Sequence, residues 1–497
     1  MWRETRLLLT GLALGLLAGM AEAQETGRDL VAQWLFERDV ALGEPPRVNV
    51  ETERPPPGIT PAGEAVVVAG DIRLALAQIG IGAGSAGREA IAQAQPVFGP
   101  GAIYLRQGRT DLDGLVDAAE AAGLDGVLFR EDGAVVARAP VVVLQGAALA
   151  LRPGDRLTLT GESGAFLLVF GGLSIEGARV DAAPSDVGDD EAFRPFVASL
   201  GTGTMRVSRS SFEGLGFDAA PLTAGLAHVA EGLFRPPEPP WIGGSRFADV
   251  YGVAAVGANG ITVTGNAFRE PRGPALTIAE SSDVRVLRNL VTEANGIHAL
   301  RVSGPGTGVV IRDNILLDGD HAALRVDDRL SDVVLVGNVV TGFAGASLIL
   351  AGGADCIAVE RNLIRGNGGD GLLATATGSL LVAGNAILGN RGSGVVLTAP
   401  AEDSETVLAG NRISGNRAGL RATSLGHLRL AENDLGGQVP RLMTGDLSQI
   451  VPFYLQQSRD GLADIVVERV SARQAAEPLG ADLSLSDLEG CGPEGGA

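Results

Sequence analysis

Lysine is absent from this chain, so all 39 basic residues are arginine, against 59 aspartates and glutamates. The formal net charge of −20 argues against nucleic acid as a partner, because binding to a phosphate backbone depends on an excess of Lys and Arg. Any anionic ligand would have to bind at a local group of arginines that overrides the field of the whole protein.

Side chains that transfer protons at neutral pH are also scarce, and aromatic residues make up only 4% of the chain. An enzyme that relies on general acid–base catalysis would have to draw on a short list of histidines and tyrosines. That list consists of His228, His298, His321, His427, Tyr104, Tyr251 and Tyr454.

Only two cysteines are present. Cys356 lies in the alternating pattern ADCIAVERN, at a position that we expect to point inward, and Cys491 lies in a glycine-rich tail. An oxidising compartment would permit a bridge between them. We adopt the simpler interpretation of a buried small side chain and a free thiol. Neither cysteine has the His, Lys or Arg neighbours that activate a nucleophilic thiol.

Long hydrophobic runs are absent except at the N-terminus. Arg3 and Arg6 precede an apolar stretch at 7–18 that is too short to span a bilayer. Ala21-Glu22-Ala23 then has the small-residue pattern of a cleavage site. We therefore predict a secretory signal over residues 1–23, a periplasmic or secreted location, and no membrane span after cleavage.

The most regular feature of the chain is a repeated asparagine. Such a period is typical of solenoids whose repeats stack on one another, and the short alternating runs of Val, Ile and Leu around each asparagine indicate strands. We predict a right-handed parallel β-helix in which the asparagines stack at one corner. Eight of them recur 22 to 26 residues apart: Asn266, Asn289, Asn314, Asn338, Asn362, Asn385, Asn411 and Asn433.

The repeat also divides the chain. A small α/β cap, with a helix near Asp111–Ala122, would cover strand edges that otherwise template aggregation. One insertion, GLFRPPEPPW at 232–241, interrupts the repeat, and long loops on a regular scaffold often form binding sites. The predicted order is a signal peptide (1–23), an extended Pro-rich leader (24–64), the cap (65–140), the β-helix (141–445), and a C-terminal cap with a mobile acidic tail (446–497).

Two arginines fall at the same position of consecutive coils. Counting back from the repeated asparagines aligns Arg301 with Arg325, so their guanidinium groups should lie side by side, one strand spacing of about 4.8 Å apart. Two like charges at this spacing need an anion beside them. Asp327 and Asp328 could supply it from within the chain, or a bound carboxylate could supply it. The sequence leaves both possibilities open.

His298 and His321 lie near the start of the same strand in those two coils. They are offset by one position, so alternation predicts that they point to opposite faces and that only one shares a face with the arginines. The sequence does not decide which one. We keep both as candidate bases, beside the alternative that each is a structural corner residue.

The segment FRPFVASLGTGTMRVSRSSFEGLGF (193–217) and the preceding coils GAFLLVFGGLSIEGARVDA (164–182) resemble periplasmic mannuronan (alginate) C5-epimerases. The resemblance covers roughly residues 140–435. It implies a right-handed parallel β-helix that acts on the uronic acids of an acidic exopolysaccharide. In that chemistry a base removes the C5 proton while a cation neutralises the carboxylate.

The run that carries the catalytic base of that family is missing. The family's G-[IVL]-D-P-H-D-R run aligns with residues 273–279, GPALTIA, which contain neither its acids nor its histidine. The family's next phrase, G-x-x-x-S-R, aligns with GIHALR, which ends at Arg301. The resemblance therefore implies a carboxylate-neutralising role for Arg301, with Arg325 similarly placed on the next coil. It leaves His298 or His321 as a relocated base.

Three functions remain open from the sequence. The first is an epimerase-like, carbohydrate-active protein of the isomerase class, with Arg301 and Arg325 binding the substrate and His298 or His321 as base. The second is a non-catalytic scaffold that binds an acidic polysaccharide or docks to its export machinery. The third is a purely structural solenoid. Scattered acids such as Asp313, Asp318 and Asp320 could bind Ca²⁺, but weakly patterned acids are usually solvated corners, so we assign no metal and no other cofactor.

Overall fold

The computed structural model describes residues 30, 32–42, 55–82, 88–95, 101–183, 193–230, 235–460, 462–479, 483–488, 490 and 491. Residues 1–50 and 51–497 form two compact units. In the first unit, residues 32–42 are helical, which corrects the expectation of an extended segment there. The predicted signal at 1–23 lies outside the described residues. Within the described part of the chain, no helix has the length and apolarity that crossing a membrane requires.

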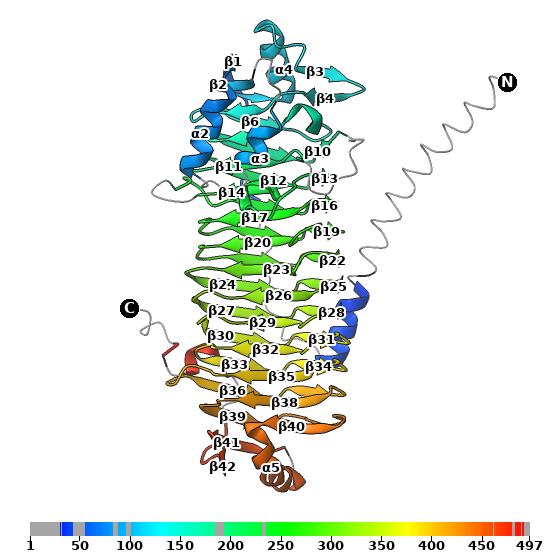
Figure 1. Cartoon of the computed structure of the whole chain (residues 1–497), viewed down its shortest axis with the longest axis vertical. Helices are drawn as coiled ribbons and strands as arrows, with labels where there is room; N and C mark the ends of the chain where they lie inside the picture. Colours follow the sequence, from blue (N-terminus) through cyan, green and yellow to red (C-terminus); the bar gives the residue numbers. More distant parts are fainter. Residues whose placement is uncertain are drawn as a thin grey trace, which may run out of the picture. The chain divides into compact units, whose positions relative to one another are not determined.

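The second unit is a stack of coils, and each coil contributes one strand to each of three ladders (Figure 1). Within a ladder, each strand pairs in parallel with the equivalent strand of the next coil. The first two ladders belong to one sheet, because β2 (Ala102–Asp111) pairs with the first strand of both. The third ladder is a separate sheet. The predicted parallel β-helix is confirmed.

The strands of each ladder are short. The first ladder contains β5 (Val141–Val143), β8 (Leu167–Val169), β11 (Val197–Leu200), β14 (Gly225–Val229), β17 (Gly252–Val256), β20 (Leu276–Ala279), β23 (His298–Ser303), β26 (Ala322–Val326), β29 (Leu348–Leu350), β32 (Leu372–Thr375), β35 (Ser393–Thr398), β38 (Ala418–Thr423) and β40 (Arg441–Gly445). The second contains β6 (Ala148–Leu151), β9 (Gly172–Glu176), β12 (Thr204–Ser208), β15 (Trp241–Gly243), β18 (Thr262–Thr264), β21 (Arg285–Leu287), β24 (Gly306–Arg312), β27 (Leu330–Val336), β30 (Asp355–Glu360), β33 (Leu380–Ala383), β36 (Glu405–Ala409) and β39 (His427–Ala431). The third contains β4 (Ala134–Ala137), β7 (Arg156–Leu159), β10 (Arg179–Ala182), β13 (Ser211–Glu213), β16 (Arg246–Ala248), β19 (Ala267–Arg269), β22 (Leu290–Ala294), β25 (Ile315–Gly319), β28 (Val339–Phe343), β31 (Leu363–Arg365), β34 (Ala386–Leu388) and β37 (Arg412–Ser414).

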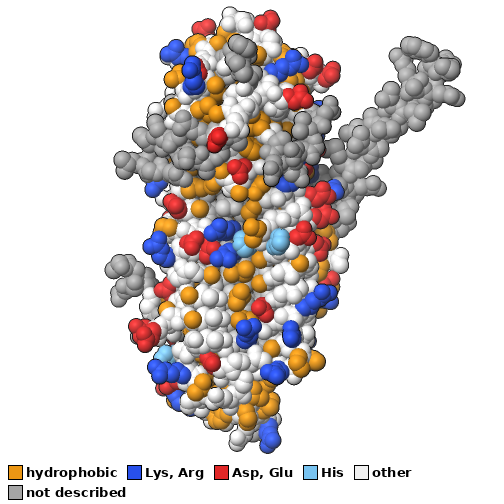
Figure 2. Space-filling model, viewed as in Figure 1, with side chains coloured by type: hydrophobic (Ala, Val, Ile, Leu, Met, Phe, Trp, Pro, Cys, Tyr) orange, Lys and Arg blue, Asp and Glu red, His pale blue; other side chains and the backbone are white. Residues whose placement is uncertain are grey.

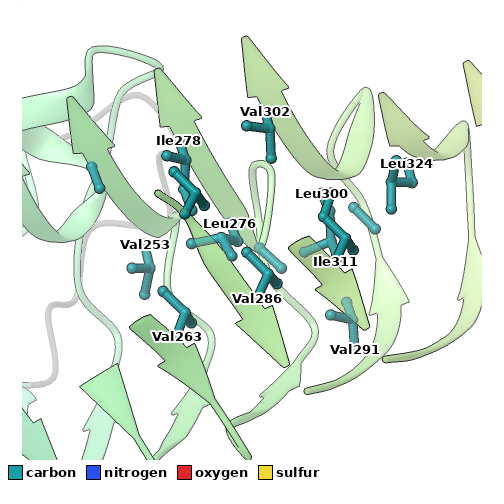
Figure 3. Close-up of a cluster of buried hydrophobic side chains, with 14 of the residues drawn as sticks. Val253, Val263, Leu276, Ile278, Val286, Val291, Leu300, Val302, Ile311 and Leu324 are labelled. Carbon is teal, nitrogen blue, oxygen red and sulfur yellow. The ribbon is translucent and has the colours of Figure 1, made fainter. Parts of the chain in front are cut away.

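The inward side chains of the three ladders meet in one continuous apolar core. Figure 3 shows Leu276 and Ile278 of β20 in the same interior as Val286 of β21 and Val291 of β22. Each such buried side chain contributes about 1.5–3 kcal/mol. Because side chains alternate along a strand, Thr277, between Leu276 and Ile278, faces outward. The outer face of the first ladder is therefore available for polar residues at every second position.

The eight repeated asparagines stack at the corner between the second and third ladders, as predicted. The carboxamide nitrogen of each of the first seven donates to Oδ1 of the asparagine one coil further on, at 2.8–3.0 Å. The backbone N–H of the same residue donates to that oxygen as well. All eight are buried, so an unpaired amide there would be costly. The asparagines hold the corner and carry no chemistry of their own.

A second polar ladder, which the sequence analysis missed, lies at the corner between the third and first ladders. Asn367 donates to Asn390 and Asn390 to Asn416, each at 3.0 Å. Gln438 ends this ladder by accepting from the backbone N–H of Asn416 at 2.9 Å.

The N-terminal cap contains the predicted helix, α4 (Leu112–Ala121). The Asp111 side chain accepts from the backbone N–H of Gly114 at 2.8 Å and so caps the start of α4. Leu115 and Val116 of α4 pack onto the end of the core. The other elements of the cap are β1 (Ala62–Gly70), which is antiparallel to β2, α2 (Ile72–Gly82), α3 (Arg88–Gln93) and β3 (Leu128–Glu131).

The opposite end of the stack is closed by α5 (Val451–Gln457), β41 (Asp464–Glu468) and β42 (Ser471–Gln474). Strand β41 pairs antiparallel with β39, which ends the parallel ladder. The Tyr454 hydroxyl of α5 donates to the backbone carbonyl of Asn433 at 2.9 Å. This bond places α5 against the last coil of the asparagine ladder.

The two cysteines form a disulfide, so the expectation of a free thiol is wrong. Cys356 and Cys491 lie 135 residues apart in sequence, with their Cα atoms at 5.4 Å. The inward assignment of Cys356 is also wrong, because the core-facing residues of β30 are Ile357 and Val359. The tail around Leu488 packs on the outer face of the second ladder, including Ala358. This part of the tail is therefore attached to the side of the β-helix.

Candidate functional site

Arg301 and Arg325 lie in register on the outer face of the first ladder, as the repeat predicted. Arg301 is paired with Thr277 on the preceding coil, and Arg325 with Ile349 on the following one. Figure 2 shows arginine, histidine and acidic side chains gathered about midway along this face. The two guanidinium groups are about two-thirds buried, with side-chain exposures of 39% and 33%.

Asp327 lies between the two arginines and is 2% exposed. Its carboxylate accepts from Nη2 of Arg301 at 3.3 Å and from Nε of Arg325. The exposed Asp328 accepts from the same Nη2 at 3.4 Å. The internal partner that the sequence left open is thus present. It occupies only one edge of each guanidinium: among the described residues, Nη1 of Arg301 and both terminal nitrogens of Arg325 have no acceptor.

His298 begins β23 and is half-buried beside this pair. Its Nδ1 is buried and has no hydrogen-bond partner in the described part of the chain. Burial, together with the positive charges of Arg325 and Arg301, lowers the pKa of His298 to about 4, while Asp327 opposes this shift. The imidazole is therefore neutral at pH 7, which is the form that can accept a proton.

His321 is exposed and directly precedes β26, outside the strand. The alternation used to place it on the opposite face from His298 applies only within a strand, so the strand pattern does not support that prediction. His321 is near enough to His298 to lower its pKa. The structure thus brings both histidines to the same region, with His298 the more enclosed of the two.

A cavity of about 360 Å³ opens beside this group. Thr277, His298 and Arg301 line it, whereas Arg325 and His321 do not. Thr277 occupies the outward position of the run that aligns with the family's catalytic histidine. The cavity is therefore lined by a threonine at the position where the aligned family run has its histidine.

Tyr251 lines the same cavity and was not singled out from the sequence. Its ring lies directly against Gly273, where any Cβ would collide with it. Burial raises the pKa of the Tyr251 phenol, with Asp218 adding to the rise and Arg272 opposing it. The phenol is therefore protonated at neutral pH and can donate. The sequence shows a glycine at 273, where a ring could pack closely. It does not show that the ring belongs to Tyr251.

Arg272 lines the cavity too, but its guanidinium is used within the fold. It donates to the carbonyls of Leu215 at 3.0 Å and Gly216 at 2.7 Å, and its Nε lies 2.9 Å from Asp249. Its role is to hold three corners together beside the cavity.

The other two histidines lie elsewhere. His427 is exposed at the start of β39. His228 of β14 is 1% exposed inside the β-helix, and both of its ring nitrogens lack partners among the described residues. Burial lowers the pKa of His228 to about 4. Neither contributes to the cavity.

Residues 242–444 match the family described as periplasmic copper-binding protein (NosD). The described residues offer no group of three close His, Cys, Asp or Glu side chains that is free to bind copper. Among those described, the one group of three His, Cys, Asp or Glu side chains with ligand atoms close together is Asp355, Cys356 and Cys491, and its two sulfurs are joined in the disulfide.

The mannuronan C5-epimerase of Pseudomonas aeruginosa is 30% identical to this chain over 184 residues, which cover 34% of this chain and 33% of the relative. The match thus spans about a third of that relative's length. The crystal structure of the periplasmic alginate epimerase AlgG superposes with a TM-score of 0.62 over 80% of this chain and 96% of that one, at 17% identity. A double mutant of AlgG gives the same TM-score at 16% identity. At such identities the superpositions establish the fold alone. The resemblance to mannuronan C5-epimerases is confirmed, in sequence over about a third of the chain and in fold over most of it.

Proposed function

We propose that this protein binds a uronate-containing polysaccharide across the outer face of the first ladder and carries out epimerase-type proton transfer at C5. The main supporting observation is that His298, which is neutral, and Arg301, whose Nη1 has no acceptor among the described residues, line the same cavity. This pair supplies the two groups that C5 proton abstraction requires: a base, and a cation for the carboxylate.

The arginine pair is the carboxylate site. Planar guanidinium groups suit carboxylates because they offer paired N–H donors. Asp327 holds one edge of Arg301 and of Arg325 and fixes their orientation, so the remaining donors are directed away from the core before a sugar binds. A uronate carboxylate beside them would also cancel the positive charges that lower the pKa of His298.

Binding of the uronate carboxylate therefore increases the basicity of His298. With the carboxylate in place, only the part of the shift that is due to the two arginines is removed. The pKa of His298 then rises, while burial still holds it below its ordinary value, and the imidazole becomes a stronger base when the C5–H bond is presented to it. The C5 proton passes to His298, and the electron pair delocalises into the neutralised carboxylate. Tyr251, protonated and in the same cavity, then donates a proton to C5. Because this proton arrives on the face of the sugar ring opposite the one from which His298 removed the first, the configuration at C5 is inverted.

A second candidate function is non-catalytic binding of the same polymer. The observation in its favour is Thr277, which cannot act as a base, at the outward position where the aligned family run has histidine. Export machinery as a partner belongs to this alternative. Both functions fit a location outside the cytoplasm, as the predicted signal at 1–23 implies.

The deciding experiment follows exchange of the C5 proton of polymannuronate in deuterated solvent. Catalysis predicts deuterium at C5, and its loss in His298→Gln while binding is retained. Binding by wild-type protein without any exchange would establish the non-catalytic scaffold.

A further inference from the structure

We propose a second carboxylate-binding site, in a cavity of about 650 Å³ on the outer face of the second ladder. It shares no lining residue with the cavity at His298. We infer that it holds a uronate-bearing stretch of the same polymer away from the reacting sugar. The ligand class rests on the proposed function, whereas the site rests on its own geometry.

Three arginines, Arg109, Arg206 and Arg235, line this cavity against a single acid, Glu238. The net charge of the protein is −20, and its overall field repels anions. A local excess of positive charge makes the potential in this cavity favourable for an anionic ligand. Arg235 and Glu238 belong to the Pro-rich insertion that interrupts the repeat.

Among these three arginines, only Arg206 forms an ion pair with Glu238. Arg206 is bound to Glu238 and to the backbone carbonyl of Pro57, so it forms a fixed wall between the insertion and the segment before β1. Arg109 is exposed and has no acceptor among the described residues. Arg235 is exposed and makes one recorded hydrogen bond, from Nη1 to the carbonyl of Ala230 at 2.7 Å. Arg109 and Arg235 therefore remain available to a ligand.

The floor between them is built from small residues. Arg109 pairs in register with Ala148, Ala148 with Gly172, and Gly172 with Thr204. Thr204 thus lies three strand spacings, about 14 Å, along the stack from Arg109. At Gly172 an added Cβ would come within 3.0 Å of Ala148 and 2.9 Å of Ile59. A shallow trough that ends in arginines suits a sugar ring with a carboxylate at its edge.

The two sites are separate along the axis. Arg206 lies on the coil of β11, and Arg301 lies on β23, four strands further along the first ladder. Four spacings correspond to about 19 Å. A polymer that contacts both would gain affinity because the second contact is intramolecular.

The test measures binding of a purified oligomannuronate, and of a neutral oligosaccharide of equal length, at fixed low salt. The variants are Arg109→Gln/Arg235→Gln and Arg301→Ala, alone and together. A matched control, Arg246→Gln/Arg412→Gln, removes two exposed arginines of the third ladder. Arg206 is left intact because it holds the insertion in place.

We expect oligomannuronate affinity to fall about tenfold or more in Arg109→Gln/Arg235→Gln, with affinity for the neutral oligosaccharide unchanged. In the Arg301→Ala background, the remaining affinity should disappear when the pair is added. Affinity equal to that of the control double variant in both backgrounds would overturn the second site. If instead Arg301→Ala has no effect while the Arg109/Arg235 pair does, the second site stands and the proposed function at Arg301 fails.

Discussion

Arg301 and Asp327, on neighbouring coils, face each other at 3.3 Å, with the carboxylate almost fully buried and the guanidinium still 39% exposed. Since Arg325 binds the same carboxylate, either arginine can be removed without leaving Asp327 unpaired. Under the proposed function, a substitution can therefore change the affinity for an external carboxylate without changing the stability of the coil.

Arg301→Ala should therefore weaken binding of oligomannuronate by about 1.5–3 kcal/mol, the scale of a charge-assisted hydrogen bond, with little change in the thermal midpoint. Calorimetric titration and thermal unfolding of one variant measure both quantities. Arg421→Ala is the control, because Arg421 is exposed in the same outward row further along the ladder. A lowered midpoint with unchanged affinity would make Arg301 structural.

Asp327→Asn should have the opposite profile. It leaves two guanidinium groups side by side without the buried anion that neutralises them, and breaking such a buried arrangement costs about 3–5 kcal/mol. The free energy of unfolding, from urea titration, is the measurement. Asp328→Asn, at an exposed position, should cost much less than 1 kcal/mol by the same assay.

The acid limb of C5 exchange should lie near pH 4 rather than 6.5. His298 must be neutral to accept a proton, and its pKa in the free protein is lowered to about 4. The rate at limiting substrate should thus stay level from neutral pH down to that region and fall below it. Arg325→Gln removes one of the charges that lower this pKa and should move the limb to higher pH. A limb that does not move in Arg325→Gln would exclude His298 as the base.

Stability should rise with pH between about 4 and 6.5 because of His228. Its folded pKa of about 4 lies below the unfolded value of 6.5, so in this window the unfolded chain binds a proton that the folded chain does not. The contribution is fully present above pH 6.5, is lost as pH falls toward 4, and amounts to about 3 kcal/mol. Unfolding at pH 5 and pH 7 should differ less in His228→Leu than in the wild type. An equal difference in both would assign the pH dependence to other groups.

Removal of the disulfide should lower the free energy of unfolding by up to about 5 kcal/mol, since it closes a loop of 135 residues. Cys491→Ser should also release the tail around Leu488, and protease should then cut there first. Limited proteolysis with and without reductant tests this, with the Cys356→Ser/Cys491→Ser variant insensitive to reductant. An intact tail after reduction would show that the apolar contacts around Ala358 suffice.

Features that follow from the coil repeat were predictable from the sequence. Contacts between segments that are distant in the sequence were not. The asparagine spacing located the corner, the ladders and the register of Arg301 with Arg325, because each follows from one period. The disulfide was missed because nothing local shows that the tail returns to β30. Tyr251 was missed because its relation to the cavity runs through Gly273 on the next coil. The face of His321 could not be predicted by alternation because this residue lies beyond the end of a strand.

The asparagine ladder also makes the coil an interchangeable unit. From Asn289 to Asn411, each asparagine presents the same donors to the coil after it and the same acceptor to the coil before it. A whole coil can therefore be added or deleted within this range without leaving either hydrogen-bonding surface unmatched. Such changes would alter the distance between residues before Asn289 and residues after Asn411 in steps of about 4.8 Å, while each asparagine still found its partner.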